Sequence, residues 1–328
     1  MPSRRPLRFP AFALLCEQTV KNPPKAAVVP GFPPVAACVG FGGYPEGLMA
    51  PALSNEDAER LRAFERAGHD LLAQGYADFF ARVTAAAIQP LLEAVRLARG
   101  MRILDVATGP GGLAAAAAGR GADVVGVDLS PRMLELAHGQ HPRLEFREAD
   151  VERLPFGDAT FDAIVCAFGI GHFPRPEAAL AECLRTLQPG GRMALSWWDE
   201  PRRQRVQGLF RDAIAEVGVR PPDSLPAGHS SLRFCATGEL LGLLQGAGLA
   251  DAGVTEHAGT FLVESVDALW RGGLGSLVLT GSAIRHQDAD TQEKVQRAFE
   301  RRALAYAGAG AGGLRIPIAF KIGAGRKL

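Results

Sequence analysis

ILDVATGPGGLA, residues 103–114, joins an apolar run to a glycine-rich turn. The apolar residues within 103–106 are typical of a short buried strand, and Gly109 and Gly111 permit the positive backbone angles of a tight turn. Strong helix formers follow at 114–118, which predicts a helix whose free N–H groups face a bound molecule. The stretch therefore predicts a strand, a glycine loop and a helix that together bind a cofactor.

A second predicted strand, 124–127, ends at Asp128, 19 positions after Gly109. An acidic residue at about that distance suits two hydrogen bonds to ribose hydroxyls. The loop also fits the G-x-G-x-x-A fingerprint of nicotinamide and flavin sites, but Asp105 places a carboxylate near a pyrophosphate and Pro110 removes an N–H donor. A cofactor with ribose and adenine but no phosphate, carrying an amino group and a sulfonium, tolerates both residues.

Five sequence blocks extend this pattern in order across residues 103–199. They are DVATGPG from Asp105, VVGVDLSPRML from Val124, EADVERLPF from Glu148, FDAIVCAFGIGHF from Phe161 and LQPGGRMALSWWD from Leu187. With these blocks the chain resembles the class I S-adenosylmethionine-dependent methyltransferases, in particular the small-molecule branch that includes quinone, sterol and secondary-metabolite methyltransferases. One departure is Ala107, which stands where the family has its first loop glycine and narrows the turn.

The resemblance implies roles in binding S-adenosylmethionine, position by position. It assigns the methionine part of the cofactor to Asp105 and the backbone at Ala107 and Gly109, in the loop that Gly111 helps to shape, and the ribose to Asp128. The remaining implied contacts are, for the adenine, Leu129, Met133, Asp150 and Val151, and for the sulfonium end, Ala167 and Phe168. Tyr76 and Thr84 are candidates for the amino acid part, although an aromatic ring and a hydroxyl on a helix also serve packing and surface.

His172 is the candidate general base. It follows the predicted fourth strand, beside the expected methyl group, and an imidazole with an ordinary pKa near about 6.5 accepts a proton at neutral pH. The alternative is a histidine that hydrogen-bonds at a strand end or shapes the cofactor pocket. His138 and His141 lie three apart on a predicted helix without a third ligand, so we expect no metal site.

Strands and helices alternate through the five blocks, which predicts an α/β, doubly wound, Rossmann-like sheet that binds ligands at the carboxyl ends of its strands. Strand-like stretches return at 253–263 and 314–323. We therefore expect seven strands, mostly parallel, with an antiparallel edge strand. Ahead of the sheet, we expect one helix from about Ser54 to His69 and another over 71–97.

The domain organisation is predicted from composition and periodicity. Residues 1–52 are rich in proline and read as an irregular N-terminal extension, with a signal peptide and organelle targeting as the alternatives. Residues 53–328 form the expected methyltransferase domain, with a lid insertion at about 200–249 and a helical insertion at about 265–307. The three tryptophans either line an apolar acceptor pocket or fill the core beneath the lid: Trp197, Trp198 and Trp270.

Composition narrows the partners. The 36 basic and 35 acidic residues give a formal charge of +1, which offers no electrostatic footprint for nucleic acid. The five cysteines show no C-x-x-C spacing and suit the reducing cytoplasm. No apolar run reaches the roughly 18 residues that span a membrane. Association between copies of the chain is left open.

These observations together predict an enzyme. We expect methyl transfer from S-adenosylmethionine to an oxygen or carbon of a small apolar, ring-containing metabolite, in secondary metabolism. Two alternatives stay open: a protein that keeps the cofactor but catalyses a cyclisation or rearrangement, and a macromolecule methyltransferase, which the missing basic surface disfavours.

Overall fold

The computed structural model describes residues 53–220, 225, 226, 228, 230, 232–308 and 313–328. The expected extension over 1–52 lies outside the described residues. Within the described ranges, every helix is too short or too polar to traverse a lipid bilayer.

A seven-stranded sheet organises the chain, in the order β3-β2-β1-β4-β5-β7-β6. The strands are β1 (Arg102–Val106), β2 (Asp123–Asp128), β3 (Glu145–Glu148), β4 (Phe161–Ala167), β5 (Leu187–Trp198), β6 (Ala250–Val263) and β7 (Leu314–Arg326). The first five strands pair in parallel, whereas β7 runs antiparallel to both β5 and β6. The predicted seven-stranded, mostly parallel sheet is confirmed, and its antiparallel strand lies next to the edge strand β6.

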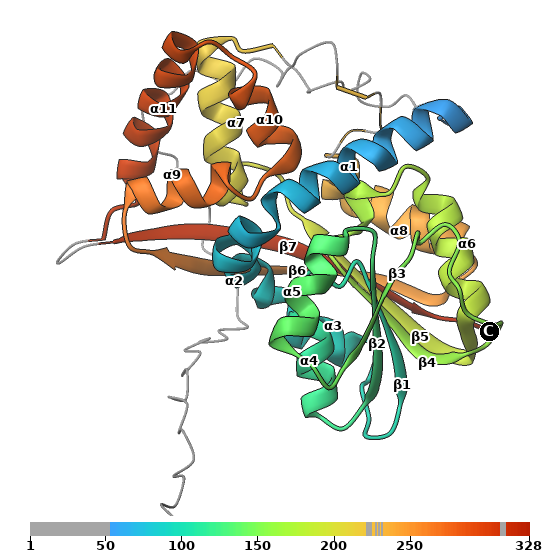
Figure 1. The fold of residues 1–328 in the computed structure, drawn as a ribbon. Coiled ribbons are helices and arrows are strands. Elements are labelled where there is room, and N and C mark those ends of the chain that lie inside the picture. The colour runs from blue at the N-terminus through green and yellow to red at the C-terminus, as the bar shows by residue number, and fades with distance from the viewer. Residues whose placement is uncertain (1–52, 221–224, 227, 229, 231, 309–312) are drawn as a thin grey trace, which may run out of the picture. The chain divides into compact units, whose positions relative to one another are not determined.

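Helices cover both faces of this sheet because the chain changes direction at β1. The connections from β1 to β2 to β3 step one way along the sheet and those from β4 to β5 step the other way, so right-handed crossovers place their helices on opposite faces. Accordingly, α4 (Gly112–Gly119) and α5 (Pro131–Gln140) pack beside β2, whereas α6 (Pro176–Thr186) packs on β5 (Figure 1). The reversal between β1 and β4 opens the crevice in which such sheets bind ligands.

The chain enters the sheet through a long helical segment. Ser54 caps α1 (Asn55–Gly75) by accepting a hydrogen bond from the Asp57 N–H at 3.1 Å. A π-helical turn (Tyr76–Phe80), α2 (Ala81–Thr84), a 3₁₀ turn (Ala85–Ala87) and α3 (Ile88–Ala94) follow. The predicted break after His69 is therefore wrong, because nothing there interrupts helical hydrogen bonding. The predicted helix over 71–97 is interrupted instead, ahead of Pro90, which lacks an N–H and crowds the preceding turn.

A group of four helices stands over the extended end of β6 and β7 (Figure 1). It consists of α7 (Arg205–Val217), α9 (Val266–Leu274), α10 (Val278–Arg285) and α11 (Ala289–Ala303). Phe210 joins α7 to the others, since its ring stacks on Trp270 at 5.3 Å and meets Phe299 at 4.4 Å between centroids. Trp270 thus fills the core of this group. Helix α8 (Thr237–Gly246) instead packs on β6 and β7.

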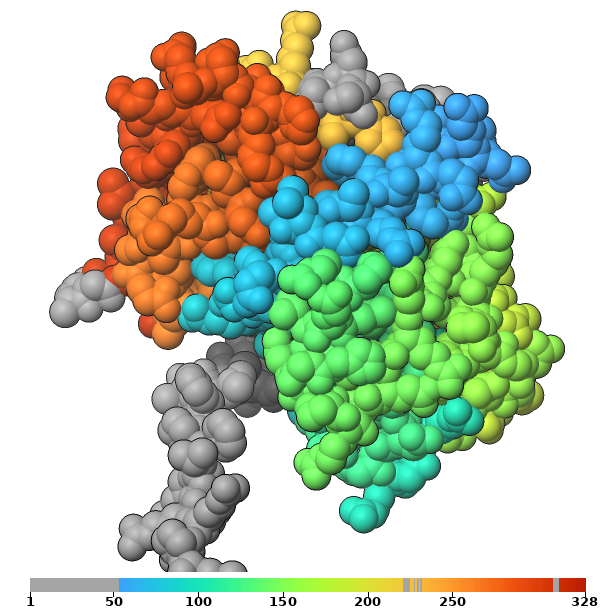
Figure 2. All heavy atoms as spheres, viewed as in Figure 1, coloured from blue at the N-terminus to red at the C-terminus, as the bar shows by residue number. Residues whose placement is uncertain are grey.

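Helix α1 lies between the helix group and the sheet-bearing part of the chain. Figure 2 shows its atoms, in blue, running across the molecule between the orange helices and the green segments around β2 and α5. It packs against α5 on one side and α10 on the other. One face of α1 is therefore positioned over the crevice at the carboxyl ends of the strands.

Candidate active site

The glycine loop between β1 and α4 has the predicted turn. Ala107, Gly109 and Gly111 all have positive φ angles, of 55°, 52° and 84°. Glycine is required at Gly111, because a β-carbon there would lie 2.8 Å from the ring of Phe146. Ala107 adopts the left-handed conformation despite its side chain, so the departure from the family pattern keeps the turn.

Asp105 lies beneath this loop and is fully buried. Its Oδ2 accepts hydrogen bonds from the Thr108 hydroxyl at 2.7 Å and the Ala114 N–H at 3.1 Å, whereas its Oδ1 has no hydrogen-bond partner among the described residues. Burial raises the pKa of Asp105 to about 7, although these two hydrogen bonds lower it. The loop therefore covers a buried carboxyl group, one of whose oxygens makes no hydrogen bond to a described residue.

Asp128 ends β2 at the mouth of the crevice. Its two oxygens accept hydrogen bonds from the backbone N–H groups of Gly109, at 2.8 Å, and Ser130, at 2.9 Å. Burial raises its pKa, against the opposing effect of these hydrogen bonds and of the charge on His69. The carboxylate is thereby fixed in orientation, with lone pairs left for further donors.

One cavity contains most of the predicted site. Twelve of the fourteen candidates line it: Tyr76, Thr84, Ala107, Gly109, Asp128, Leu129, Met133, Asp150, Val151, Ala167, Phe168 and His172. Asp105 and Gly111 are not among its lining residues, since they lie beneath and behind the loop. Their effect on a ligand passes through the shape and charge of the loop.

The same cavity continues from the cofactor loop to an aromatic wall. Phe168 stacks on Trp198 with 3.8 Å between ring centroids, and its N–H donates to the Ser196 hydroxyl at 3.0 Å. Trp197 and Trp198 both line the cavity, as do residues 277–280 ahead of and within α10. Tyr76 also lines the cavity, with its hydroxyl 3.5 Å from Thr84 Oγ1, and burial raises its pKa to about 12. Its phenol is therefore a neutral hydrogen-bonding group at physiological pH.

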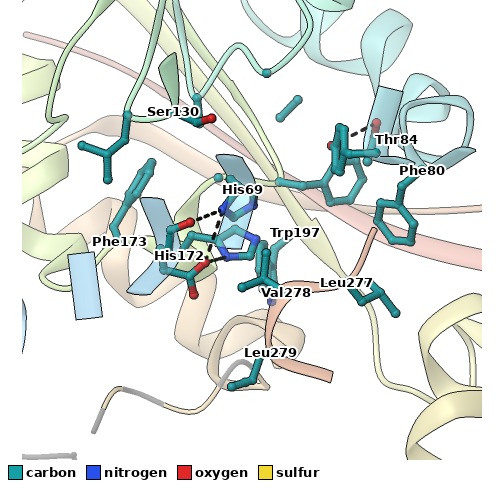
Figure 3. Close-up of a pocket in the computed structure, with 18 of the residues that line it drawn as sticks. His69, Phe80, Thr84, Ser130, His172, Phe173, Trp197, Leu277, Val278 and Leu279 are labelled. Carbon is teal, nitrogen blue, oxygen red and sulfur yellow. Dashed lines mark hydrogen bonds and ion pairs between the residues drawn. The ribbon is translucent and has the colours of Figure 1, made fainter. Parts of the chain in front are cut away.

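His172 ends a 3₁₀ turn (Ile170–His172) after β4, and Figure 3 shows its ring beside that of His69 of α1. Its Nδ1 lies 3.1 Å from Glu65 Oε2, and its ring meets that of His69 edge-on at 5.0 Å. Burial alone lowers the pKa of His172, but the charge and hydrogen bond of Glu65, with the charge of Asp128, outweigh burial and raise it. His172 thus has a charge partner within the cavity.

Glu65, His69 and His172 bring metal-ligating atoms within 4.8 Å of one another. Both imidazole Nδ1 atoms lie near the same oxygen, Glu65 Oε2, at 3.1 and 3.5 Å. The His69 Nδ1 also lies 2.9 Å from the Glu65 carbonyl oxygen, so its proton is already committed to the helix backbone. We interpret this trio as a hydrogen-bonded charge cluster.

The cavity-facing side of α1 was missed by the sequence analysis. Arg62, Glu65, Arg66 and His69 all line the cavity, and Arg62 lies 3.0 Å from Asp150 Oδ2 and 3.1 Å from Glu152 Oε2. Their spacing of three and four residues places them on one helix face. This polar stripe can be seen in the sequence, but a helix face that is exposed to solvent gives the same pattern, so the stripe alone does not indicate a binding site.

Part of the chain that lines the cavity matches a known family. Residues 104–195 match the model for a methyltransferase domain. The chain contains a class I methyltransferase domain. The blocks that first indicated this family lie at β1, β2, β4 and β5 and in the loops between them, which are the elements around the crevice.

Curated relatives match part of the chain. The demethylmenaquinone methyltransferase of Renibacterium salmoninarum is 36% identical over 137 residues, which is 42% of this chain and 55% of that protein. That of Deinococcus radiodurans is 40% identical over 116 residues, or 34% and 48%. An uncharacterised protein of Mycobacterium tuberculosis is 33% identical over 139 residues, or 41% and 51%. The chain thus spans about half the length of the curated relatives it matches.

Solved structures also resemble the methyltransferase domain. A protein assigned as a methyltransferase of an antibiotic biosynthesis pathway in Anabaena variabilis is 22% identical, with a TM-score of 0.49 over 74% of this chain and 97% of its own. The [4+2]-cyclase SpnF is 20% identical, with a TM-score of 0.43 over 74% and 80%.

The residues of the methyltransferase domain fit S-adenosylmethionine, the cofactor of this family. The fixed Asp128 carboxylate at the cavity wall suits a ribose diol, and the buried Asp105 beneath the loop places a second carboxyl group near the expected methionine part. Leu129, Met133 and Val151 supply apolar surface for an adenine ring. A dinucleotide would instead bring its phosphates to two carboxylates, which electrostatics disfavours.

Proposed function

We propose that the chain transfers a methyl group from S-adenosylmethionine to an oxygen or carbon of a small apolar molecule that contains a ring. The observation that carries the proposal is the single cavity that joins the cofactor-side residues to an aromatic wall. Flat apolar walls beside a cofactor site suit a ring-shaped acceptor. The names of the curated relatives, which act on demethylmenaquinone, support a quinol-type ring.

S-Adenosylmethionine, when bound, supplies a methyl group that is already activated by its sulfonium. The chain then has to hold the acceptor in line and exclude water, and such positioning contributes several kcal/mol to rate enhancement. Asp128 and the loop at Ala107–Gly109 hold the cofactor side. The acceptor would lie against the aromatic wall that is formed by Phe168, Trp197 and Trp198.

We propose His172 as the base that removes a proton from the acceptor. Its Nδ1 proton is held by Glu65 at 3.1 Å, which leaves Nε2 as the proton-accepting atom. Glu65 stabilises the imidazolium that forms when Nε2 takes the proton, in the way an acid partner supports a catalytic histidine. Placement of this reaction in secondary metabolism remains a prediction.

Calorimetry on the purified protein tests the cofactor assignment. S-Adenosylmethionine and S-adenosylhomocysteine should bind, NAD should not, and Asp128→Ala should weaken binding by about 1.5–3 kcal/mol, the value of hydrogen bonds to a charged group. Asp123→Ala, at the exposed start of β2, is the matched control. Binding of NAD without either S-adenosyl compound would overturn the proposal.

Methyl transfer itself is tested with 1,4-dihydroxynaphthalene and S-adenosylmethionine labelled at the methyl carbon. We expect a labelled product, and NMR of that carbon distinguishes a ring methyl from a methoxy group. If the cofactor binds but neither this nor other phenolic ring compounds are methylated, the acceptor class is wrong.

A further inference from the structure

Helix α7 presents a row of polar side chains to the far end of the cavity. Gln204, Gln207 and Arg211 all line the cavity, and their spacing of three and four residues places them on one helix face. This row comes from the segment that follows β5, outside the elements that hold the cofactor loop. Other residues of the cavity wall include Trp197, Trp198 and residues 277–279, together with the carboxylate of Asp199, which pairs with Lys321 at 2.8 Å.

Gln204 is buried, with 1% of its surface exposed, and its amide orientation is fixed by the helix. It is the N-cap of α7, where its Oε1 accepts a hydrogen bond from the Gln207 N–H at 2.9 Å. Because the oxygen is engaged by a backbone donor, the other end of the amide must be the nitrogen. The side chain therefore presents an N–H₂ group whose position follows from the capping bond.

That nitrogen has no hydrogen-bond partner within the part of the chain that the structure describes. Nε2 of Gln204 is buried and makes no hydrogen bond to any described residue. Buried amide donors are nearly always satisfied, and one that is not destabilises the protein unless a ligand or water completes it. An unsatisfied donor in the wall of a binding cavity suits an oxygen that arrives with the ligand.

We propose that Gln204 is a recognition residue for an oxygen of the acceptor molecule, of the carbonyl type, at the end of the cavity remote from the cofactor loop. This inference rests on the proposed function, because it assumes that the cavity takes an acceptor. It adds that the acceptor carries a hydrogen-bond-accepting oxygen there. A site built around a fixed donor discriminates against analogues that lack the oxygen, because they leave the donor unpaired.

The test compares two ligands that differ only in this oxygen. 1-Tetralone and 1,2,3,4-tetrahydronaphthalene share a ring skeleton, and one carries a carbonyl. Their dissociation constants are measured on the full chain at pH 8 by tryptophan fluorescence, with and without saturating S-adenosylhomocysteine. The readout is the ratio of the two constants, in which general effects on hydrophobic binding cancel.

Two variants separate recognition from capping. Gln204→Asp keeps a favourable N-cap carboxylate but lacks the amide donor, and Gln204→Leu lacks both groups. We expect the preference for the ketone to fall roughly tenfold in both, the size of one lost hydrogen bond. The melting temperature should fall mainly in Gln204→Leu. Gln296→Leu, on α11 and outside the cavity lining, should leave the ratio unchanged.

An unchanged ratio in Gln204→Asp would show that the residue only caps the helix, and would overturn the inference. Binding of neither compound to the unmodified chain would overturn it too. Failure of S-adenosylhomocysteine to bind, in contrast, would count against the proposed function. The ratio of the two dissociation constants measured without S-adenosylhomocysteine would still test the role of Gln204.

Discussion

Asp105 is a carboxyl group held beneath the glycine loop with its pKa raised to about 7 by burial. In the unfolded chain the same group titrates near about 4. Below that pH both states hold the proton, whereas between about 4 and 7 only the folded state does. The free energy of unfolding therefore falls as pH rises through this window, by up to about 1.4 kcal/mol per pH unit.

Asp105→Asn should remove this dependence. The asparagine oxygen keeps an acceptor for the Thr108 hydroxyl and the Ala114 N–H, and its amide nitrogen replaces the unpartnered oxygen. Urea unfolding without cofactor at pH 5 and pH 8 measures the effect: the variant should lose less stability between the two than the unmodified chain. Asp123→Asn, on the exposed end of β2, serves as the control. Equal losses in all three chains would show that Asp105 titrates normally.

The pair of Glu65 and His172 gives a second prediction at this scale. Glu65→Gln removes the charge that raises the pKa of His172, so that pKa should fall. NMR titration of the labelled histidine ring measures the shift directly. The ascending limb of the methylation rate with pH should move to lower pH by the same amount. Glu59→Gln, on the exposed side of α1, should leave both unchanged.

If His172 is the base, His172→Ala should lower the methylation rate roughly a hundredfold with cofactor affinity nearly intact. A Glu65→Gln chain whose pH profile does not move would separate Glu65 from the reaction. Loss of cofactor binding in His172→Ala would instead assign His172 to the wall of the pocket.

At the scale of elements, α1 is held across the crevice by its charged face. Arg62 lies within ion-pair distance of Asp150 and Glu152, and its side chain is only 10% exposed, although its N–H groups are not aligned for hydrogen bonds. Arg66 makes a comparable contact with Glu148 at 2.6 Å, but both of those side chains are about half exposed. The ion pairs of Arg62 and Arg66 are thus similar in length but differ in how far they are buried.

Arg62→Ala should lower the free energy of unfolding by on the order of 2 kcal/mol, because it removes a buried cation from Asp150 and leaves the buried Glu152 with Arg175 alone. Arg66→Ala should cost about 0.5 kcal/mol or less, as exposed pairs do. Chemical denaturation of both variants gives the comparison. Similar small losses would mean that water replaces Arg62 as readily as Arg66.

Local elements could be predicted from the sequence where a single segment determines them. The strands at 103–106 and 124–127 were predicted to within one residue of their ends, because apolar runs bounded by glycines or acidic residues mark them. The face of α1 could not be predicted, because its partners lie about 80 to 110 residues further along the chain. Glu65 and His172, for example, are separated by 107 positions.

At the scale of the whole molecule, residues 53–328 contain every described helix and strand. A chain that begins at Leu53 should therefore fold and bind S-adenosylhomocysteine with unchanged affinity. Circular dichroism and calorimetry, with the full chain as control, test this. Aggregation or lost binding in the shortened chain would place residues 1–52 in the folded core.

The position of β7 has a consequence for biosynthesis. It lies between β5 and β6 in space but follows both in sequence. During translation, β6 emerges about 50 residues before β7. It then has no strand to pair with, because β7, which lies between β5 and β6 in the sheet, has not yet been synthesised. The backbone N–H and C=O groups along β6 stay unpaired, and available to other chains, until β7 has left the ribosome as far as Arg326. Unpaired strand edges of this kind promote aggregation. Nascent chains stalled just before β7 should therefore depend on chaperones, while the released 328-residue chain should not.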